Sequence, residues 1–161
     1  MPLPITPPTD ESGMTKPDDA WELWFDGTAA PNPGRVGIGA LIVSPAGDHH
    51  EISTAPGKHG CSNEAELLAL AAALEFAQCK GAARLCIHGD SRFVVDCLNG
   101  CDSTEIQRLA MLIDQLRMRL AGFAAWELRW LPRHRNKTAD RLARAALGLA
   151  EKLPKKRKRR K

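Results

Sequence analysis

The spacing of apolar residues changes at about residue 60, and this change constrains the fold more than any other feature. Before it, three short runs of strand type cover residues 20–26, 36–43 and 51–54, separated by turns rich in Gly, Pro and Asn. After it, residues 63–79 place apolar side chains at helical spacing in a segment rich in Ala, Leu and Glu. The chain therefore begins with paired strands and continues with a helix that can cover them.

The rest of the sequence alternates between helix and strand. Residues 84–88 form an apolar run typical of a buried strand, and residues 126–130 alternate apolar and charged side chains, as a strand with one apolar face does. Helices are predicted over residues 92–98, 104–121 and 137–153, with Ile106 on the inner face of the second. The order β-β-β-α-β-α-α-β-α indicates an α/β fold with a five-stranded mixed sheet and helices on both faces.

Length and composition fit one domain between two tails. The chain has 161 residues, of which 43% are hydrophobic, and this is enough for a single core. Residues 1–19 hold five prolines and no periodic apolar pattern, so we expect them to be disordered. The folded domain is expected to span residues 20–153, and residues 154–161 to form a basic tail.

The positive charge of the chain is concentrated in that tail. The formal net charge is +4, and removing the seven basic residues of the tail leaves 16 basic against 19 acidic side chains, a net charge of −3. The run suits either a nuclear-localisation signal or a sequence-independent contact with nucleic-acid phosphates. These seven residues are Lys155, Lys156, Arg157, Lys158, Arg159, Arg160 and Lys161.

Composition gives no sign of a membrane or of secretion. No stretch approaches the roughly 20 consecutive apolar residues of a membrane span, and the N-terminus lacks the pattern of a signal peptide. We expect a cytoplasmic monomer, with association with the nucleoid left open and a nuclear location if the source is eukaryotic. The five cysteines are odd in number and include no Cys-x-x-Cys pair, so we expect free thiols without a disulfide partner.

Four acidic residues are predicted to lie where elements begin or end. Asp26 closes the first strand, Glu66 is in the first turn of the 63–79 helix, Asp90 follows the 84–88 strand, and Asp140 is in the first turn of the last helix. In α/β sheets, functional groups gather at such positions along one edge. Four carboxylates brought together would repel one another unless cations bind, and Mg²⁺ or Mn²⁺ suits oxygen ligands.

Each of these acids also has a local structural interpretation. Asp26 with Gly27 is a common turn dipeptide, and Asp140 is a favourable charge near a helix N-terminus. Glu66 and the pair Asp90-Ser91 could serve as helix caps.

Four motifs follow one another along residues 20–150: Phe25-Asp26-Gly27-Thr28 with Asn32-Pro33-Gly34, then Ser62-Asn63-Glu64-Ala65-Glu66-Leu67, then His88-Gly89-Asp90-Ser91, and finally LPRHRNKTADRLA at 131–143. Together and in this order they resemble the type 1 ribonucleases H. The resemblance implies a ribonuclease H-like fold. It also implies an endoribonuclease that hydrolyses the RNA strand of RNA/DNA hybrids and leaves a 5′-phosphate and a 3′-hydroxyl. A non-catalytic hybrid-binding module on the same fold is the alternative.

The resemblance implies roles for the acids and for one histidine. Asp26, Glu66, Asp90 and Asp140 match the family's metal-binding carboxylates, which hold two Mg²⁺ ions with substrate, Mn²⁺ being the other candidate. Glu66, rather than Glu64, takes the catalytic place in the motif. His134 is a candidate for proton transfer or product release, with a phosphate contact or a solvated side chain as alternatives.

The resemblance also implies a set of substrate-binding residues, which would recognise the 2′-hydroxyl groups of RNA. They are Gly27, Thr28, Asn32, Ser62, Asn63 and Ser91. Asn32 could equally be a turn residue. Trp126 and Trp130 share one face of their strand and are expected to pack on the sheet rather than to stack on bases.

The sequence departs from the best-known members in two places. Cys61 and Glu64 stand where those members have a Thr and an Arg that help to hold a DNA phosphate. Only residues 99–103 join the predicted 92–98 and 104–121 helices, where well-studied members carry a basic helix and loop. The chain therefore resembles a compact subgroup that lacks this basic handle.

Overall fold

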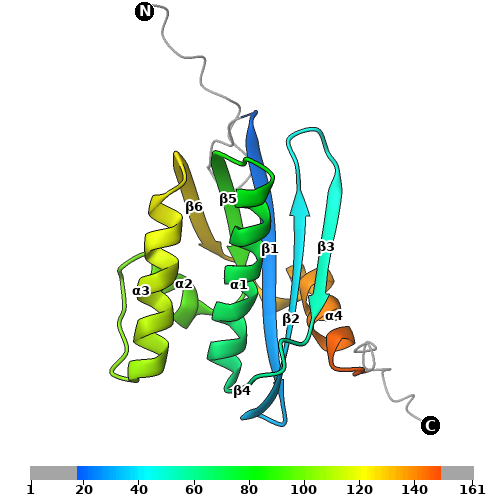
Figure 1. Ribbon diagram of the computed structural model, residues 1–161, viewed down its shortest axis with the longest axis vertical. Coiled ribbons are helices and arrows are strands. Elements are labelled where there is room, and N and C mark those ends of the chain that lie inside the picture. Colours follow the sequence, from blue (N-terminus) through cyan, green and yellow to red (C-terminus); the bar gives the residue numbers. More distant parts are fainter. Residues whose placement is uncertain (1–17, 150–161) are drawn as a thin grey trace, which may run out of the picture.

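Six strands form one mixed sheet in the computed structural model, which describes residues 18–149 (Figure 1). The strand order is β3-β2-β1-β5-β6, with the short β4 paired to β2. The first three strands pair antiparallel, and β1, β5 and β6 run parallel. The strands are β1 (Ala20–Ala30), β2 (Gly34–Val43), β3 (His49–Thr54), β4 (His59–Gly60), β5 (Arg84–Gly89) and β6 (Ala125–Trp130).

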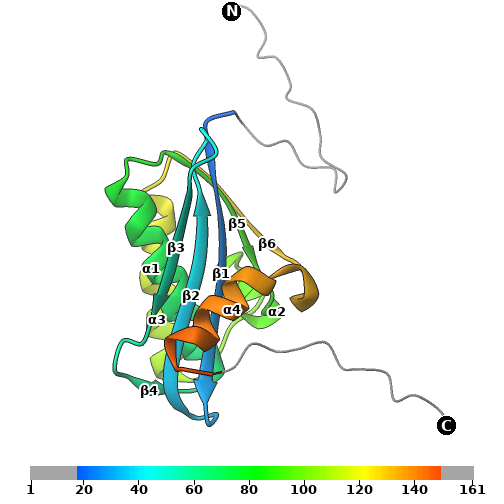
Figure 2. The same cartoon turned by 90° about the vertical axis from the view of Figure 1, so that its right-hand side faces the viewer.

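Helices cover both faces of the sheet. The helices α1 (Ser62–Cys79) and α3 (Gln107–Ala121) lie on one face, and α4 (Lys137–Ala146) crosses the other (Figure 2). A short helix α2 (Arg92–Leu98) follows β5, and a 3-10 turn, η1 (Arg133–Arg135), precedes α4. The predicted fold class and the five predicted strands are confirmed. The two-residue β4 was missed, because so short a segment has no period.

The first strand is longer than predicted, and this changes the position of Asp26. The sequence predicted that β1 ends at Asp26, but β1 stays paired with β2 as far as Ala30, opposite Arg35. Its parallel neighbour β5 ends earlier, at Gly89 opposite Phe25. Asp26 therefore lies within β1, just past the point where β5 ends, and the Asp26-Gly27 turn interpretation is wrong.

Two predicted helix boundaries are also wrong. The hydroxyl of Thr104 accepts a hydrogen bond from the Ile106 amide at 3.1 Å, and this local turn delays α3 until Gln107. Ile106 is consequently 46% exposed instead of facing inward. The last helix ends at Ala146, and Gly148 beyond it has a φ of +72°, a left-handed conformation that glycine adopts readily at a helix end.

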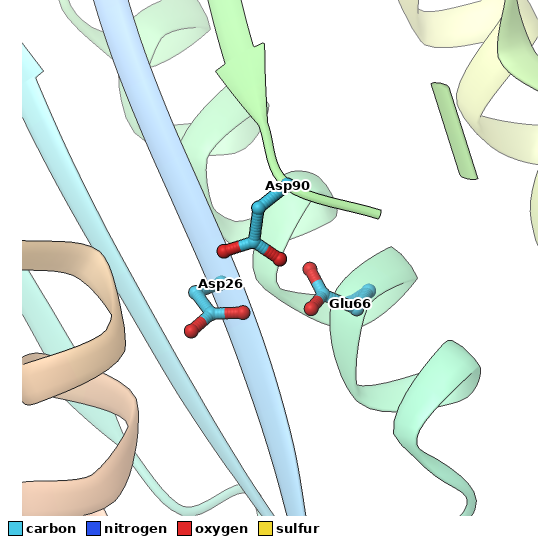
Figure 3. Close-up of side chains that lie close together, drawn as sticks. All are labelled: Asp26, Glu66 and Asp90. Carbon is cyan, nitrogen blue, oxygen red and sulfur yellow. The ribbon is translucent and has the colours of Figure 1, made fainter. Parts of the chain in front are cut away.

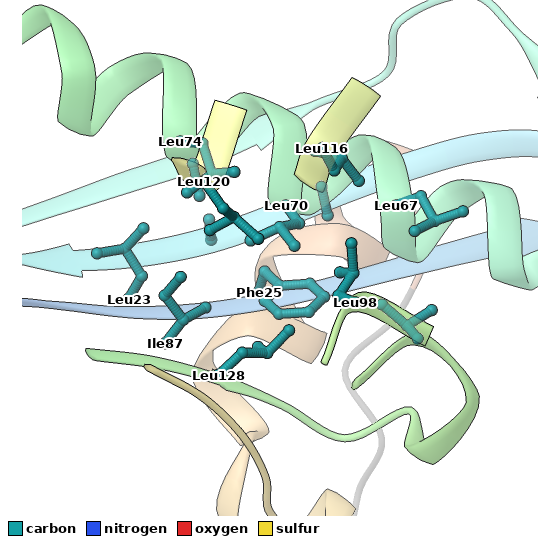
Figure 4. Packing of buried hydrophobic residues seen from close by; sticks show 14 of the residues in the cluster. Leu23, Phe25, Leu67, Leu70, Leu74, Ile87, Leu98, Leu116, Leu120 and Leu128 are labelled. Atoms are coloured by element: carbon teal, nitrogen blue, oxygen red, sulfur yellow. The ribbon is translucent and has the colours of Figure 1, made fainter. Parts of the chain in front are cut away.

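The hydrophobic core lies between the sheet and the helices α1 and α3 (Figure 4). Leu23 and Phe25 of β1 are fully buried against Leu70 and Leu74 of α1. On β6, Leu128 is buried and Trp126 packs against this core, as predicted, whereas Trp130 at the end of the strand is 37% exposed. The alternation of residues 126–130 therefore predicted the strand but not the environment of its last residue.

The described range leaves some predictions untested. The predicted disordered segment falls outside it apart from residues 18 and 19, and the basic tail falls outside it entirely. Among the helices of residues 18–149, none combines the length and the apolar character that a membrane span requires. All five cysteines are free thiols.

Candidate active site

Three carboxylates from three different elements converge beyond the end of β5 (Figure 3). Asp26 comes from β1, Glu66 from α1, and Asp90 from the link between β5 and α2. One oxygen of each lies within 4.8 Å of the others. Asp26 and Glu66 are each only 6% exposed, so this cluster is built into the protein interior and is not a solvated acidic surface.

Asp140 approaches the cluster from the opposite face of the sheet. It lies in the first turn of α4, its negative charge acts on Asp26, and it lines one cavity together with the other three acids. The structure therefore brings all four sequence-predicted carboxylates to one place, although they are spread over more than a hundred residues of the chain.

Glycines on β1 and β2 allow the two helices to come this close. A Cβ on Gly27 would lie 2.1 Å from the carbonyl carbon of Ala65, next to Glu66 in α1. A Cβ on Gly39 would lie 2.4 Å from the carbonyl oxygen of Ala139, next to Asp140 in α4. No other residue type fits at either position without moving a helix, so these glycines set the depth at which Glu66 and Asp140 sit.

Burial and mutual repulsion both disfavour the charged forms of the carboxylates in this cluster. Burial, together with repulsion from Asp90 and Asp140, raises the pKa of Asp26 to about 7. Burial and the charge of Asp26 raise the pKa of Glu66 well above its usual value. Burial also raises the pKa of Asp90, although a hydrogen bond from Asn136 and the positive charge of Arg133 act in the opposite direction.

A divalent cation fits this donor set. The Oε2 atom of Glu66 is buried and has no hydrogen-bond partner among the described residues. Buried polar atoms are nearly always paired, and a carboxylate oxygen facing other carboxylates cannot be satisfied by them unless it or they carry a proton. Clustered carboxylate oxygens are the ligands that hard divalent ions take. The cluster is therefore able to bind a metal ion.

A cavity of about 350 Å³ opens over the carboxylates. Its lining contains every sequence-predicted site residue that the structure describes except His134: Asp26, Gly27, Thr28, Asn32, Ser62, Asn63, Glu66, Asp90, Ser91 and Asp140. On one wall, the Oδ1 atom of Asn32 accepts a hydrogen bond from the Ser62 amide at 3.1 Å. This bond ties the loop after β1 to the start of α1, so Asn32 is not merely a turn residue.

His134 lies apart from these residues. It is exposed in η1 and lines a second cavity of about 360 Å³, together with Trp24 and Leu41. Its role in proton transfer stays a prediction.

Three residues of this region were missed by the sequence analysis. Asn136 is 2% exposed, and its Nδ2 atom donates both to the Phe25 carbonyl and to Oδ2 of Asp90, each at 2.9 Å. Arg133 and Arg144 line the carboxylate cavity and place positive charge on its walls. Asn136 precedes α4, where an Asn is ordinarily a helix cap, but its side chain does not cap the helix.

The two departures from the family pattern have a structural counterpart. Glu64 faces α3, where its Oε1 accepts from Arg108 Nε at 2.6 Å and from the Cys61 amide at 3.5 Å. It does not line the carboxylate cavity, which agrees with the choice of Glu66. Only residues 99–106 separate α2 from α3, so no additional basic helix lies between them.

The chain is similar to proteins of a known family. The model of the family described as "Reverse transcriptase-like" matches residues 24–146. The ribonuclease HI of Halobacterium salinarum is 35% identical over 144 residues, which are 87% of this chain and 71% of that protein. A bifunctional protein of Mycobacterium tuberculosis is 33% identical over 129 residues, 78% of this chain, and the match spans only 35% of that longer protein.

Solved structures agree with the sequence matches. The crystal structure of RNase H1 from Halobacterium salinarum superposes with a TM-score of 0.76 at 35% identity and covers 80% of this chain and 98% of that one. The structure of LC11-RNase H1 in complex with an RNA/DNA hybrid superposes with a TM-score of 0.73 at 27% identity and covers 80% of this chain and 96% of that one.

Proposed function

The chain belongs to the ribonuclease H family, and we propose from this membership that it is an endoribonuclease that hydrolyses the RNA strand of RNA/DNA hybrids. Its products would carry a 5′-phosphate and a 3′-hydroxyl. One observation carries the proposal furthest: Asp26, Glu66 and Asp90 converge within 4.8 Å at the floor of a cavity. A related ribonuclease H1 has been solved with an RNA/DNA hybrid bound.

We propose Mg²⁺ as the cofactor, with two ions bound when substrate is present and Mn²⁺ as a substitute. The oxygen-only donor set supports this choice, and so does the buried Oε2 of Glu66, which has no hydrogen-bond partner within residues 18–149. Such ions, when bound, activate a water molecule and stabilise the leaving oxygen of the scissile phosphate. Asp26, Glu66, Asp90 and Asp140 would hold them.

The other residues of the cavity would bind and orient the hybrid. Asn32, Ser62 and Asn63 offer donors and acceptors on one wall, which suit the 2′-hydroxyl groups that distinguish RNA from DNA. Arg133 and Arg144 on the cavity walls offset the charge of the phosphates. Gly27, Thr28 and Ser91 complete the set, and His134 stays a candidate for proton transfer or product release.

We propose further that the basic tail (residues 155–161) anchors the enzyme on nucleic acid. The tail carries seven positive charges, and the folded domain has no basic helix between α2 and α3 that could bind the hybrid instead. Contacts between Lys or Arg side chains and phosphates are electrostatic and do not depend on nucleic-acid sequence. A monomer is sufficient, because all four carboxylates come from one chain. We place its action where hybrids form, in the cytoplasm beside the nucleoid or in the nucleus of a eukaryote.

Cleavage of matched duplexes tests this function. The same sequence is labelled as RNA/DNA hybrid, as double-stranded RNA and as DNA, and each is incubated with and without Mg²⁺. Only the RNA strand of the hybrid should be cut, and only with the metal. The Asp90→Asn variant keeps the size of the side chain and an acceptor for Asn136, and it should bind hybrid without cutting it.

The alternative function gives a different result in the same assay. A non-catalytic hybrid-binding module would bind the hybrid and leave both strands intact with every divalent ion tried. All four carboxylates are present, which favours hydrolysis. Cleavage that persists in Asp90→Asn would contradict the site assignment rather than the activity.

A further inference from the structure

Asp90 differs from the other two converging carboxylates in the part of the fold that carries it. Asp26 lies within a strand and Glu66 within a helix, so the backbone hydrogen bonds of those elements fix both. Asp90 lies in the two-residue link between β5 and α2 and is less buried than either. Repulsion among like charges acts on all three carboxylates, and the link that carries Asp90 is the segment that this repulsion can displace most easily.

Two contacts from outside the link hold Asp90 in place. Asn136 holds its side chain by the 2.9 Å bond to Oδ2. The indole Nε1 of Trp130 donates to its backbone carbonyl at 3.0 Å. Trp130 is the last residue of β6 and lies opposite Gly89, the residue before Asp90. The indole therefore fixes the main chain of the link to the neighbouring strand.

The indole is itself held from the other side of the link. The guanidinium carbon of Arg92 lies 3.9 Å from the centroid of the Trp130 ring, which is a close cation–π contact. Arg92 is the first residue of α2. The edge of the Trp130 ring thus contacts Asp90, and the face of the ring contacts Arg92. This accounts for a tryptophan that is 37% exposed on a strand whose Trp126 and Leu128 pack inward.

We propose that Trp130 is a positioning residue of the active site: its indole N–H, held by Arg92, fixes the backbone of Asp90 so that the carboxylate stays within metal-binding distance of Asp26 and Glu66. This inference rests on the proposed metal-dependent function. Trp130 is absent from the lining of the carboxylate cavity, and its contact with the site is through the backbone of Asp90.

Metal affinity without substrate tests the proposal. Binding of Mn²⁺ and of Mg²⁺ to the full chain is measured by calorimetry for the wild type and for Trp130→Phe, which keeps an aromatic ring but loses the N–H donor. The dissociation constant should rise by about twofold to tenfold, the range that one net hydrogen bond supplies. With hybrid at a fixed Mg²⁺ concentration below saturation, kcat should fall while KM for the hybrid stays within twofold.

Two further variants separate positioning from stability. Trp126→Phe makes the same change on the same strand, opposite Leu85 and away from Asp90, and should leave metal affinity unchanged. Replacing Trp130 by benzothienylalanine keeps the ring area and removes only the N–H, and should weaken metal binding as Trp130→Phe does. Melting temperatures of all the variants are recorded alongside.

The outcomes distinguish this inference from the proposed function. Unchanged metal affinity in both Trp130 variants overturns the inference, even if the wild type cleaves hybrids. A raised KM with unchanged metal affinity also overturns it, because Trp130 would then contact the substrate directly. Weaker metal binding in the Trp130 variants supports it, even if the wild type cleaves no hybrid, in which case the proposed function alone fails.

Discussion

The pKa values of Asp26 and Glu66 make the stability of the metal-free protein depend on pH. In the folded protein the pKa of Asp26 rises from 3.8 to about 7, and that of Glu66 also rises well above its ordinary value. At pH values between the unfolded and folded pKa, the folded state holds protons that the unfolded state has released, so its stability falls as pH rises. The fall is at most about 1.4 kcal/mol per pH unit for each group.

Chemical denaturation in EDTA checks this dependence. The free energy of unfolding should be smaller at pH 8 than at pH 5, and Mg²⁺ should restore part of the difference at pH 8 by neutralising the cluster. Asp26→Asn should reduce the difference between the two pH values, because one of the buried charges is gone. A wild type and an Asp26→Asn variant with the same pH dependence would show that Asp26 is ionised in both states.

The sequence predicted the acids of the site better than the residues that orient them. Four carboxylates could be identified because they lie in motifs that follow one another in a recognisable order. Asn136 and Trp130 act on backbone carbonyls, of Phe25 and of Asp90, which are 111 and 40 positions away in the sequence. A carbonyl group is present in every residue, so no sequence pattern marks such a partner. These roles appear only when the chain is folded.

At the scale of elements, two glycines determine how closely α1 and α4 approach the sheet. Gly27→Ala would push Ala65 and with it Glu66 away from β1, and Gly39→Ala would push Ala139 and with it Asp140. Each substitution should lower the free energy of unfolding by about 1–3 kcal/mol, the usual cost of overpacking. Hydrolysis should fall further than stability explains, and Gly27→Ala should also weaken metal binding, because Glu66 belongs to the converging triad.

A glycine outside the site provides the control. Gly122 ends α3 with a φ of −77°, and the nearest atom to a new Cβ would be the Arg119 carbonyl oxygen at 3.2 Å. Gly122→Ala should change stability by less than about 1 kcal/mol and leave hydrolysis unchanged. Stability and activity are compared at one temperature well below every midpoint. If Gly27→Ala is as stable and active as Gly122→Ala, the close approach of α1 to β1 does not depend on Gly27.

Element boundaries show what the sequence pattern could not predict. The apolar period predicted which segments are helix or strand, because that period reflects one buried face. The end of β1 was predicted wrongly, because Asp26-Gly27 is typical of a turn when it is considered alone. In the structure this dipeptide is part of a strand, because β2 pairs with β1 as far as Ala30. The position of Asp26 beyond the end of β5 depends on the unequal lengths of two paired strands, which neither strand encodes alone.

For the molecule as a whole, charge is divided between the body and the basic tail. Residues 1–154 have a net charge of −3, and residues 155–161 carry seven positive charges. The carboxylate cluster adds negative charge where the hybrid must bind, so a body of this charge gains little from long-range attraction to phosphates. Under the proposed function, the tail would supply that attraction.

Replacement of the tail tests this division of roles. A chain ending at Pro154 and a chain with seven serines in place of residues 155–161 should both bind hybrid more weakly. Their log–log dependence of affinity on salt should also be less steep, because each phosphate contact contributes about 0.9 to that slope on B-DNA. Seven lysines in the same place should restore both affinity and slope, since attraction to phosphates requires charge and no particular order of Lys and Arg. The value of kcat at saturating hybrid should be equal in all four proteins. A lysine tail that fails to restore binding would instead indicate that a partner recognises the specific tail sequence. An unchanged salt slope in the truncated chain would mean that the tail does not contact the hybrid.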